Sequence, residues 1–148
     1  MLRVESSIKV NAPRDRVFKL LSHPELIADR MDSVKSIEII SRGADSVLTE
    51  TVAGTDGRDT TLILESKFFP PERIETHQIK GELRSLESRD IINDVEGGTI
   101  VTETVDFDLG LPLFGNLLGR MGISQVIQEQ VDERLAVLKQ LAEAESVR

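Results

Sequence analysis

Two acidic residues, Asp90 and Glu103, stand in segments whose other residues alternate between apolar and polar side chains. Alternation with a period of two is typical of strands that bury one face, so each acid can be assigned to a face. Both fall on the more apolar, inward face of a predicted sheet. The inward rows are predicted to be Leu86, Ser88, Asp90 and Ile92 on one strand and Val101, Glu103, Val105, Phe107 and Leu109 on the next. Of these, Val101, Val105 and Phe107 are expected to contact a ligand.

A turn centred on Glu96–Gly97 would place the two acids directly opposite each other. The same register pairs Ile92 with Val101, so the two inward rows agree with it. Two carboxylates this close in an apolar cavity cannot both ionise cheaply, and one is expected to have a raised pKa. Asp90 and Glu103 are therefore candidate catalytic residues for proton transfer in a cyclase or dehydratase.

Two alternatives for Asp90 stay open. In the first, the Asp90 side chain would point to solvent. In the second, it would form an ion pair with a nearby arginine such as Arg84 or Arg89. Neighbouring strands carry further polar residues on their inward rows, and these would extend a polar patch in a ligand-binding wall. They are Ser66, Thr76 and Gln78.

Other chemistry has little support in the residues. His23 precedes Pro24 at a helix break, and His77 falls on an outward row of its strand. Neither histidine has a second histidine at the spacing of a metal site. The chain has no cysteine, and we expect no metal site. It also lacks a Gly-x-Ser-x-Gly elbow and a phosphate-binding loop, so we expect no nucleotide cofactor and favour binding over catalysis.

The amino-acid composition excludes several classes of binding partner. The net charge of -8 and the lack of a basic stripe argue against nucleic-acid binding. Aromatic residues make up only 3% of the 148 residues, with no Trp or Tyr, so any pocket should be aliphatic and unsuited to ligands recognised by stacking. No segment has the apolar run of a signal peptide or membrane span, and a cytoplasmic location is expected.

The order of elements predicts an α+β fold. A strand over Leu2–Val10 precedes a helix over Arg14–Ser22 and a second short helix over Glu25–Ala28. Turn signals divide Ser33–Leu109 into consecutive strands, including a hairpin turn at Asp56–Gly57. We predict one domain, residues 1–148, with a curved antiparallel sheet of about seven strands.

A long amphipathic helix is predicted from Ser124 to the end, with Ile127 on its apolar face, where it is expected to contact a ligand. It is the one long element available to cover the apolar face of the sheet. Before it lies an apolar segment with glycines at 110, 115, 119 and 122, which suggests close packing, a lid, a transient membrane contact or a contact patch for a partner protein. The residues expected near the cavity entrance are Met31, Leu113, Phe114, Leu117, Leu118 and Met121.

Several short motifs, in this order and spacing, resemble the START-like superfamily, which includes polyketide cyclases and coenzyme Q-binding proteins. The resemblance spans nearly the whole chain. It is carried by Ser7–Pro13 with Val17-Phe18, Pro70–Ile74, Gly81 with Leu86-Glu87, Gly97–Thr99, Val105–Phe107, Leu138-Lys139 and Glu143.

The resemblance implies a helix-grip architecture, in which the sheet wraps around the long C-terminal helix and encloses a cavity. It implies binding or transport of a small hydrophobic ligand that is lipid-, quinone- or polyketide-like. A cyclase or dehydratase using Asp90 and Glu103, and an interaction module using residues 111–121, remain alternatives. Relatives often carry an aromatic pair where this chain has Asp90 and Ile92, so a more polar pocket is expected here.

Overall fold

The computed structural model describes residues 1–55, 58–110 and 117–146, with the backbone alone at 55, 58, 117–121 and 145–146. In these ranges the chain forms one antiparallel sheet and three helices. The strands are β1 (Leu2–Val10), β2 (Val34–Arg42), β3 (Ser46–Thr55), β4 (Arg58–Phe69), β5 (Arg73–Lys80), β6 (Ser85–Val95) and β7 (Gly98–Asp108). The helices are α1 (Arg14–Leu21), α2 (Pro24–Ala28) and α3 (Leu117–Ser146).

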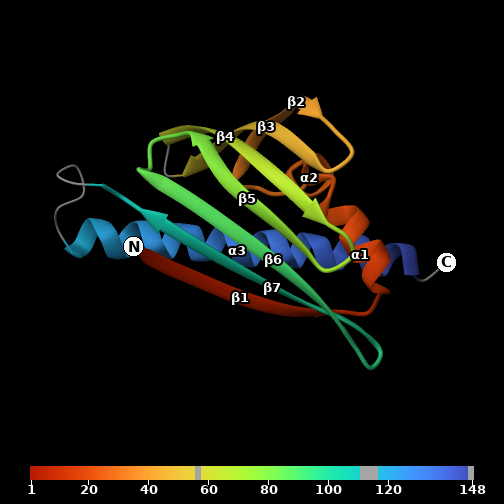
Figure 1. Ribbon diagram of the computed structural model, residues 1–148. Helices are drawn as coiled ribbons and strands as arrows, with labels where there is room; N and C mark the ends of the chain where they lie inside the picture. Colours follow the sequence, from red (N-terminus) through yellow and green to blue (C-terminus); the bar gives the residue numbers. More distant parts are fainter. Residues whose placement is uncertain (56–57, 111–116, 147–148) are drawn as a thin grey trace.

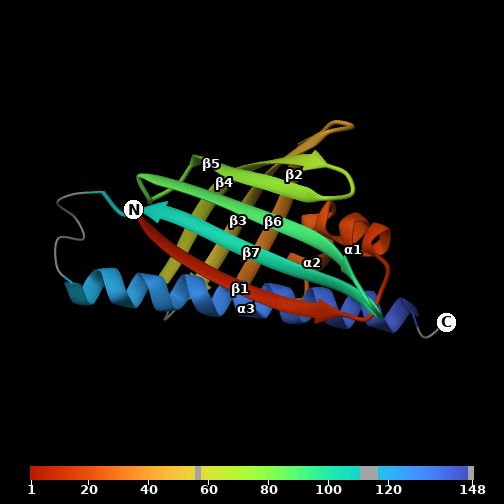
Figure 2. The ribbon, with the colours of Figure 1, turned by 60° about the horizontal axis from the view of Figure 1, so that its bottom comes forward.

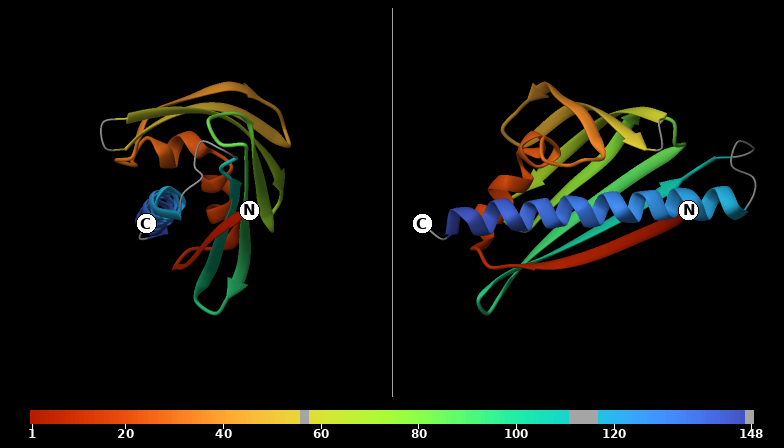
Figure 3. Two further views of the ribbon diagram at one scale, coloured as in Figure 1. Left: turned by 90° about the vertical axis from the view of Figure 1, so that its left-hand side faces the viewer. Right: turned by 180° about the vertical axis from the view of Figure 1, so that it is seen from behind.

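The sheet has the strand order β1-β7-β6-β5-β4-β3-β2. Consecutive strands β1 and β2 therefore lie at opposite edges, and α1 and α2 cross between them (Figure 1). The sheet curls around α3, which runs along its concave side next to β1 and also contacts α1 and α2 (Figure 3). This arrangement confirms the predicted helix-grip architecture with two short helices after the first strand.

The β6–β7 hairpin sets the register of the wall that faces α3. Gly97 has a φ of 81°, a left-handed conformation that glycine adopts without strain, so the chain turns at the predicted position. Gly98 has no room for a side chain, because a Cβ there would collide with the carbonyl oxygen of Val10. In the resulting ladder Asp90 faces Glu103, which confirms the predicted register.

Helix α3 is fastened to the rest of the fold by carboxylates. Glu133 accepts hydrogen bonds from the backbone N–H of Asp32 (2.7 Å), and from the N–H and hydroxyl of Ser33 (3.3 and 2.6 Å). Farther along the helix, Glu143 accepts a hydrogen bond from the backbone N–H of Asn11 at 2.9 Å. These bonds connect α3 to the loop before β2 and to the residue after β1, and Figure 2 shows α3 running alongside β1.

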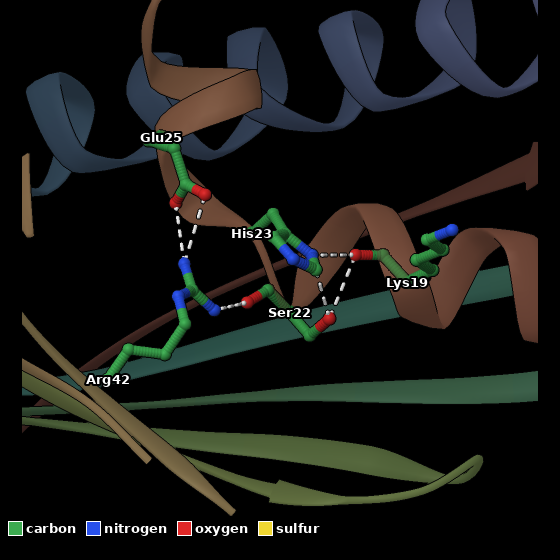
Figure 4. Close-up of polar contacts among 5 residues, drawn as sticks. All are labelled: Lys19, Ser22, His23, Glu25 and Arg42. Carbon is green, nitrogen blue, oxygen red and sulfur yellow. Dashed lines mark hydrogen bonds and ion pairs between the residues drawn. The ribbon is translucent and has the colours of Figure 1, made fainter. Parts of the chain in front are cut away.

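A polar cluster fixes the joint between α1 and α2 (Figure 4). The Ser22 hydroxyl donates to the carbonyl of Lys19 at 2.8 Å, and Nδ1 of His23 lies 2.8 Å from the same oxygen. From β2, the Arg42 guanidinium donates to the carbonyl of Ser22 (3.0 Å) and to both carboxylate oxygens of Glu25 (3.0 and 2.9 Å). This cluster holds α2 against the strand that it precedes.

The long helix begins earlier than its apolar periodicity predicts, at Leu117 rather than Ser124. Helical backbone continues through Gly119 and Gly122, since a glycine costs a helix only about 1 kcal/mol and does not by itself end it. The predicted turn at Asp56–Gly57 lies outside the described residues. Among the described residues, no helix is both long and apolar enough to cross a membrane.

Candidate functional site

A cavity of about 190 Å³ lies between the concave face of the sheet and α3. Most of its wall is aliphatic, as the low aromatic content predicts. Three parts of the fold border the cavity. The sheet forms its floor, α2 and the loop after it form one side, and α3 forms the roof. Its apolar lining residues are Pro24, Ala28, Met31, Val34, Ile37, Ala53, Leu62, Leu64, Leu86, Val105, Ile127 and Val131.

A second cavity of about 210 Å³ adjoins the first toward the start of α3. The two share Ala53, Leu62, Leu86, Ile127 and Gln130 in their walls. Along α3 the lining runs from residue 134 to residue 123, a distance of roughly 16 Å at 1.5 Å per residue. The space is therefore elongated and follows the helix.

Charged side chains line this space at Arg134 and Glu103, and Glu82 lines the adjoining cavity. Arg134 of α3 points back to the sheet, where its Nη1 donates to Glu103 Oε1 at 2.6 Å and to both carboxylate oxygens of Asp90 at 3.3 Å. The exposed fractions of the residues are 2% for Asp90 and 6% for Glu103, and that of the Arg134 side chain is 22%. Glu103 and Arg134 line the cavity, while Asp90 lies behind them and is not part of its wall.

Burial decides the protonation of this cluster. It raises the pKa of the Glu103 carboxyl to about 8, and the neighbouring Asp90 adds to the increase while Arg134 opposes it. Burial also disfavours the charge on Arg134, but the two acidic neighbours outweigh burial and hold the pKa of the guanidinium above its usual value. Burial therefore favours the protonated form of Glu103, while the guanidinium of Arg134 beside it stays charged.

Hydroxyl groups continue the polar region across the sheet. Ser66, Thr76 and Ser88 lie side by side on β4, β5 and β6, and all three line the cavity. The hydroxyls of Ser66 and Thr76 are 2.7 Å apart and hydrogen-bonded to each other. The cavity therefore has a polar strip on its floor between aliphatic walls.

The comparisons with known proteins agree with this geometry. The model of the family described as polyketide cyclase / dehydrase and lipid transport matches residues 1–143. The chain belongs to this family. No curated protein matches the chain.

Solved structures of similar proteins share the fold of this chain. A protein of Thermus thermophilus, TTHA0849, is 25% identical with a TM-score of 0.90, and the match covers 98% of this chain and 99% of that one. The Zhui aromatase/cyclase of a Streptomyces species is 19% identical with a TM-score of 0.87, covering 99% and 96%. A START superfamily protein of Mycobacterium smegmatis is 18% identical with a TM-score of 0.77, covering 96% and 97%. The last two are similar in fold alone.

Within this family fold, the predicted site residues separate into three groups. Those that line the cavity are Met31, Ser66, Thr76, Glu103, Val105 and Ile127. Leu113, Phe114 and the side chains of Leu117, Leu118 and Met121 lie outside the described residues, and so does the contact patch expected at residues 111–121.

The remaining predicted residues do not line the cavity. Val101 and Phe107 face inward as predicted, but both are fully buried in the core and are separated from the cavity by packing. Gln78 is not part of either cavity wall, and its Nε2 donates to the carbonyl of Leu83 in the next loop at 2.8 Å. Asp90 faces α3 rather than solvent, and its arginine partner is Arg134 rather than Arg84 or Arg89.

Arg134 is the functional candidate that sequence reasoning missed. It lies three residues after Val131 and four before Leu138, both of which are buried on the inward face of α3. An arginine on an otherwise apolar stripe of a helix needs a buried acidic partner, since an unpaired charge there is costly. That placement, combined with the two predicted inward acids, is the signal that would have found it.

The histidines take no part in the cavity. His77 lies on the outer face of the sheet with Nε2 3.4 Å from Glu65, and His23 belongs to the cluster between α1 and α2. In the described part of the chain, no group of three or more His, Cys, Asp or Glu side chains is arranged to hold a metal ion.

Proposed function

We propose that the protein binds a small hydrophobic molecule in the cavity between the sheet and α3, and carries or senses it. The observation that supports this most is an elongated, mainly aliphatic space with an arginine–carboxyl cluster at one end, formed by Arg134 and Glu103. Ligand pockets are commonly mostly apolar, with a few placed polar groups that orient the ligand. Membership of a family described by lipid transport as well as cyclisation agrees with the proposal.

The proposal is tested by extracting purified protein with organic solvent and by native mass spectrometry of the untreated protein. The expected result is a copurified apolar compound, or saturable uptake of the neutral fluorophore N-phenylnaphthylamine by the extracted protein. The chain contains no Trp or Tyr, so the fluorescence of the probe is read against almost no background. A protein that copurifies with nothing and takes up no probe would contradict the proposal.

A second function, acid catalysis on a bound carbonyl compound, is favoured by one specific observation. Glu103 lines the cavity, and burial raises the pKa of its carboxyl, so its protonated form can donate a proton to a ligand oxygen. The carbonyl would be polarised further by Arg134. Because Asp90 does not line the cavity, this chemistry would depend on Glu103 rather than on both acids.

Acid catalysis is tested with α-tetralone in deuterium oxide, by following exchange of its α-protons with NMR. Protonation of the carbonyl promotes enol formation and therefore exchange. We expect the wild type to accelerate exchange and Glu103→Gln to lose the acceleration. Equal rates for the wild type, Glu103→Gln and buffer alone would exclude this role of Glu103 and leave the binding function untouched.

A further inference from the structure

Arg134 uses only some of its N–H donors to bind its two acidic neighbours. Each of its hydrogen bonds and ion pairs with the described residues uses Nη1. A guanidinium has five N–H donors on three nitrogens, so those on Nε and Nη2 have no partner in the part of the chain that the structure describes. Since Arg134 lines the cavity and its side chain stays 22% accessible, these donors are open to a ligand.

The charges around Arg134 restrict what it can accept. Asp90 and Glu103 already face its guanidinium at 3.3 and 2.6 Å, so the cation already has acidic partners, whether or not Glu103 keeps its proton. A ligand carboxylate would add a further negative charge to a site that is largely removed from water, at a considerable desolvation cost. A neutral acceptor oxygen takes the same hydrogen bonds without bringing in a charge.

The rest of the wall defines the other end of the ligand. Beyond Arg134, the roof continues with Val131 and Ile127, and the floor opposite them with Leu62, Leu86 and Val105. These side chains offer dispersion contacts and no hydrogen bonds. The part of the ligand that lies against these side chains is expected to be apolar, although Gln130, Thr49 and Thr51 also line the cavity.

Resting on the proposed binding function, we propose that the ligand is a neutral apolar molecule whose carbonyl oxygen is held by the free donors of Arg134. Asp90 and Glu103 act as positioning residues, because they hold the guanidinium against the sheet with its other edge toward the cavity. The site therefore selects neutral carbonyl compounds over hydrocarbons of the same shape, and over carboxylates.

The test compares three molecules built on one two-ring scaffold: tetralin, α-tetralone and tetralin carboxylate. Isothermal titration calorimetry with the wild type is expected to show that α-tetralone binds roughly tenfold or more tightly than tetralin, the ratio expected of one hydrogen bond to a charged donor. The carboxylate is expected to bind more weakly than the ketone. Because this comparison uses the wild type alone, it does not depend on how well any variant folds.

Variants then assign the preference to Arg134. Arg134→Met and Arg134→Lys should reduce the affinity for α-tetralone toward that for tetralin, and the lysine keeps a cation opposite the two acids if the methionine variant does not fold. The matched control is Arg3→Met, which removes an exposed arginine from the outer face and should change neither affinity.

Two results would overturn the inference in distinguishable ways. If tetralin binds but α-tetralone gains nothing, or if the carboxylate binds more tightly than the ketone, the assignment of ligand class is wrong and the binding function stands. If none of the three binds and N-phenylnaphthylamine is not taken up, the binding function itself is wrong.

Discussion

Replacing Glu103 with glutamine removes an ionisable group without changing its shape, so its effect on stability reports the protonation of the buried site. Burial raises the pKa of Glu103 to about 8, from the ordinary value of 4.5. The folded state thus binds this proton more tightly than the unfolded state does. Its contribution to stability is fully present below about pH 4.5 and is lost as the pH rises to about 8.

The size of the effect follows from the same shift. Within that window each pH unit costs the wild type up to about 1.4 kcal/mol relative to Glu103→Gln. Between about pH 5 and pH 7 the unfolding free energy of the variant should therefore rise relative to that of the wild type by roughly 2–3 kcal/mol. Near the acid end of the window the two proteins should be nearly equal in stability.

The assay is urea unfolding followed by far-ultraviolet circular dichroism, since the chain has no Trp or Tyr to report unfolding by fluorescence. The matched control is Glu87→Gln, which removes an exposed carboxylate from the outer face of β6. A difference between Glu103→Gln and the wild type that stays constant with pH would refute the conclusion that burial favours the protonated form of Glu103.

Further substitutions test the contacts around the cavity. Arg134→Met leaves Asp90 and Glu103 buried without a cation, so it should lower the unfolding free energy by about 3–5 kcal/mol at pH 7 and by less at pH 5, as denaturant unfolding at both pH values would show; equal losses would contradict this. Glu133→Ala removes the acceptor between α3 and the loop before β2, and should cost roughly 1–3 kcal/mol and speed probe release in stopped-flow measurements, unlike the exposed Glu129→Ala. Leu138→Ala should cost about 2–5 kcal/mol in the same unfolding assay, because Leu138 is fully buried in the core; a loss below 1 kcal/mol would contradict its role.

The sequence allowed the order of elements and the β6–β7 register to be predicted, because alternation and a glycine turn fix which residues face each other. It therefore placed Asp90 opposite Glu103 correctly. It could not show that α3 delivers Arg134 to the same point, since the rotation of a helix against a sheet depends on contacts far apart in the chain, such as that of Glu133 with Ser33. The inward orientation of a strand residue also does not show whether it lines the cavity or is buried in the core. Val101 faces inward but is fully buried in the core.

The start of α3 was also mispredicted for a local reason. Glycines at 119 and 122 weaken the helical pattern, yet the backbone hydrogen bonds continue through them. Single-residue propensities of about 1 kcal/mol are easily overridden by the fold that surrounds them.

The most direct test of the binding function is to fill the cavity and measure what happens to binding. Ala53 lines both halves of the space, and Ala53→Trp should occupy it. The control is Ala136→Trp, which adds the same side chain on the exposed face of α3. In titrations with N-phenylnaphthylamine, we expect Ala53→Trp to lose binding while it keeps the circular dichroism spectrum of the wild type, and Ala136→Trp to bind normally. If the folded Ala53→Trp variant binds the probe as the wild type does, the cavity between the sheet and α3 is not the binding site.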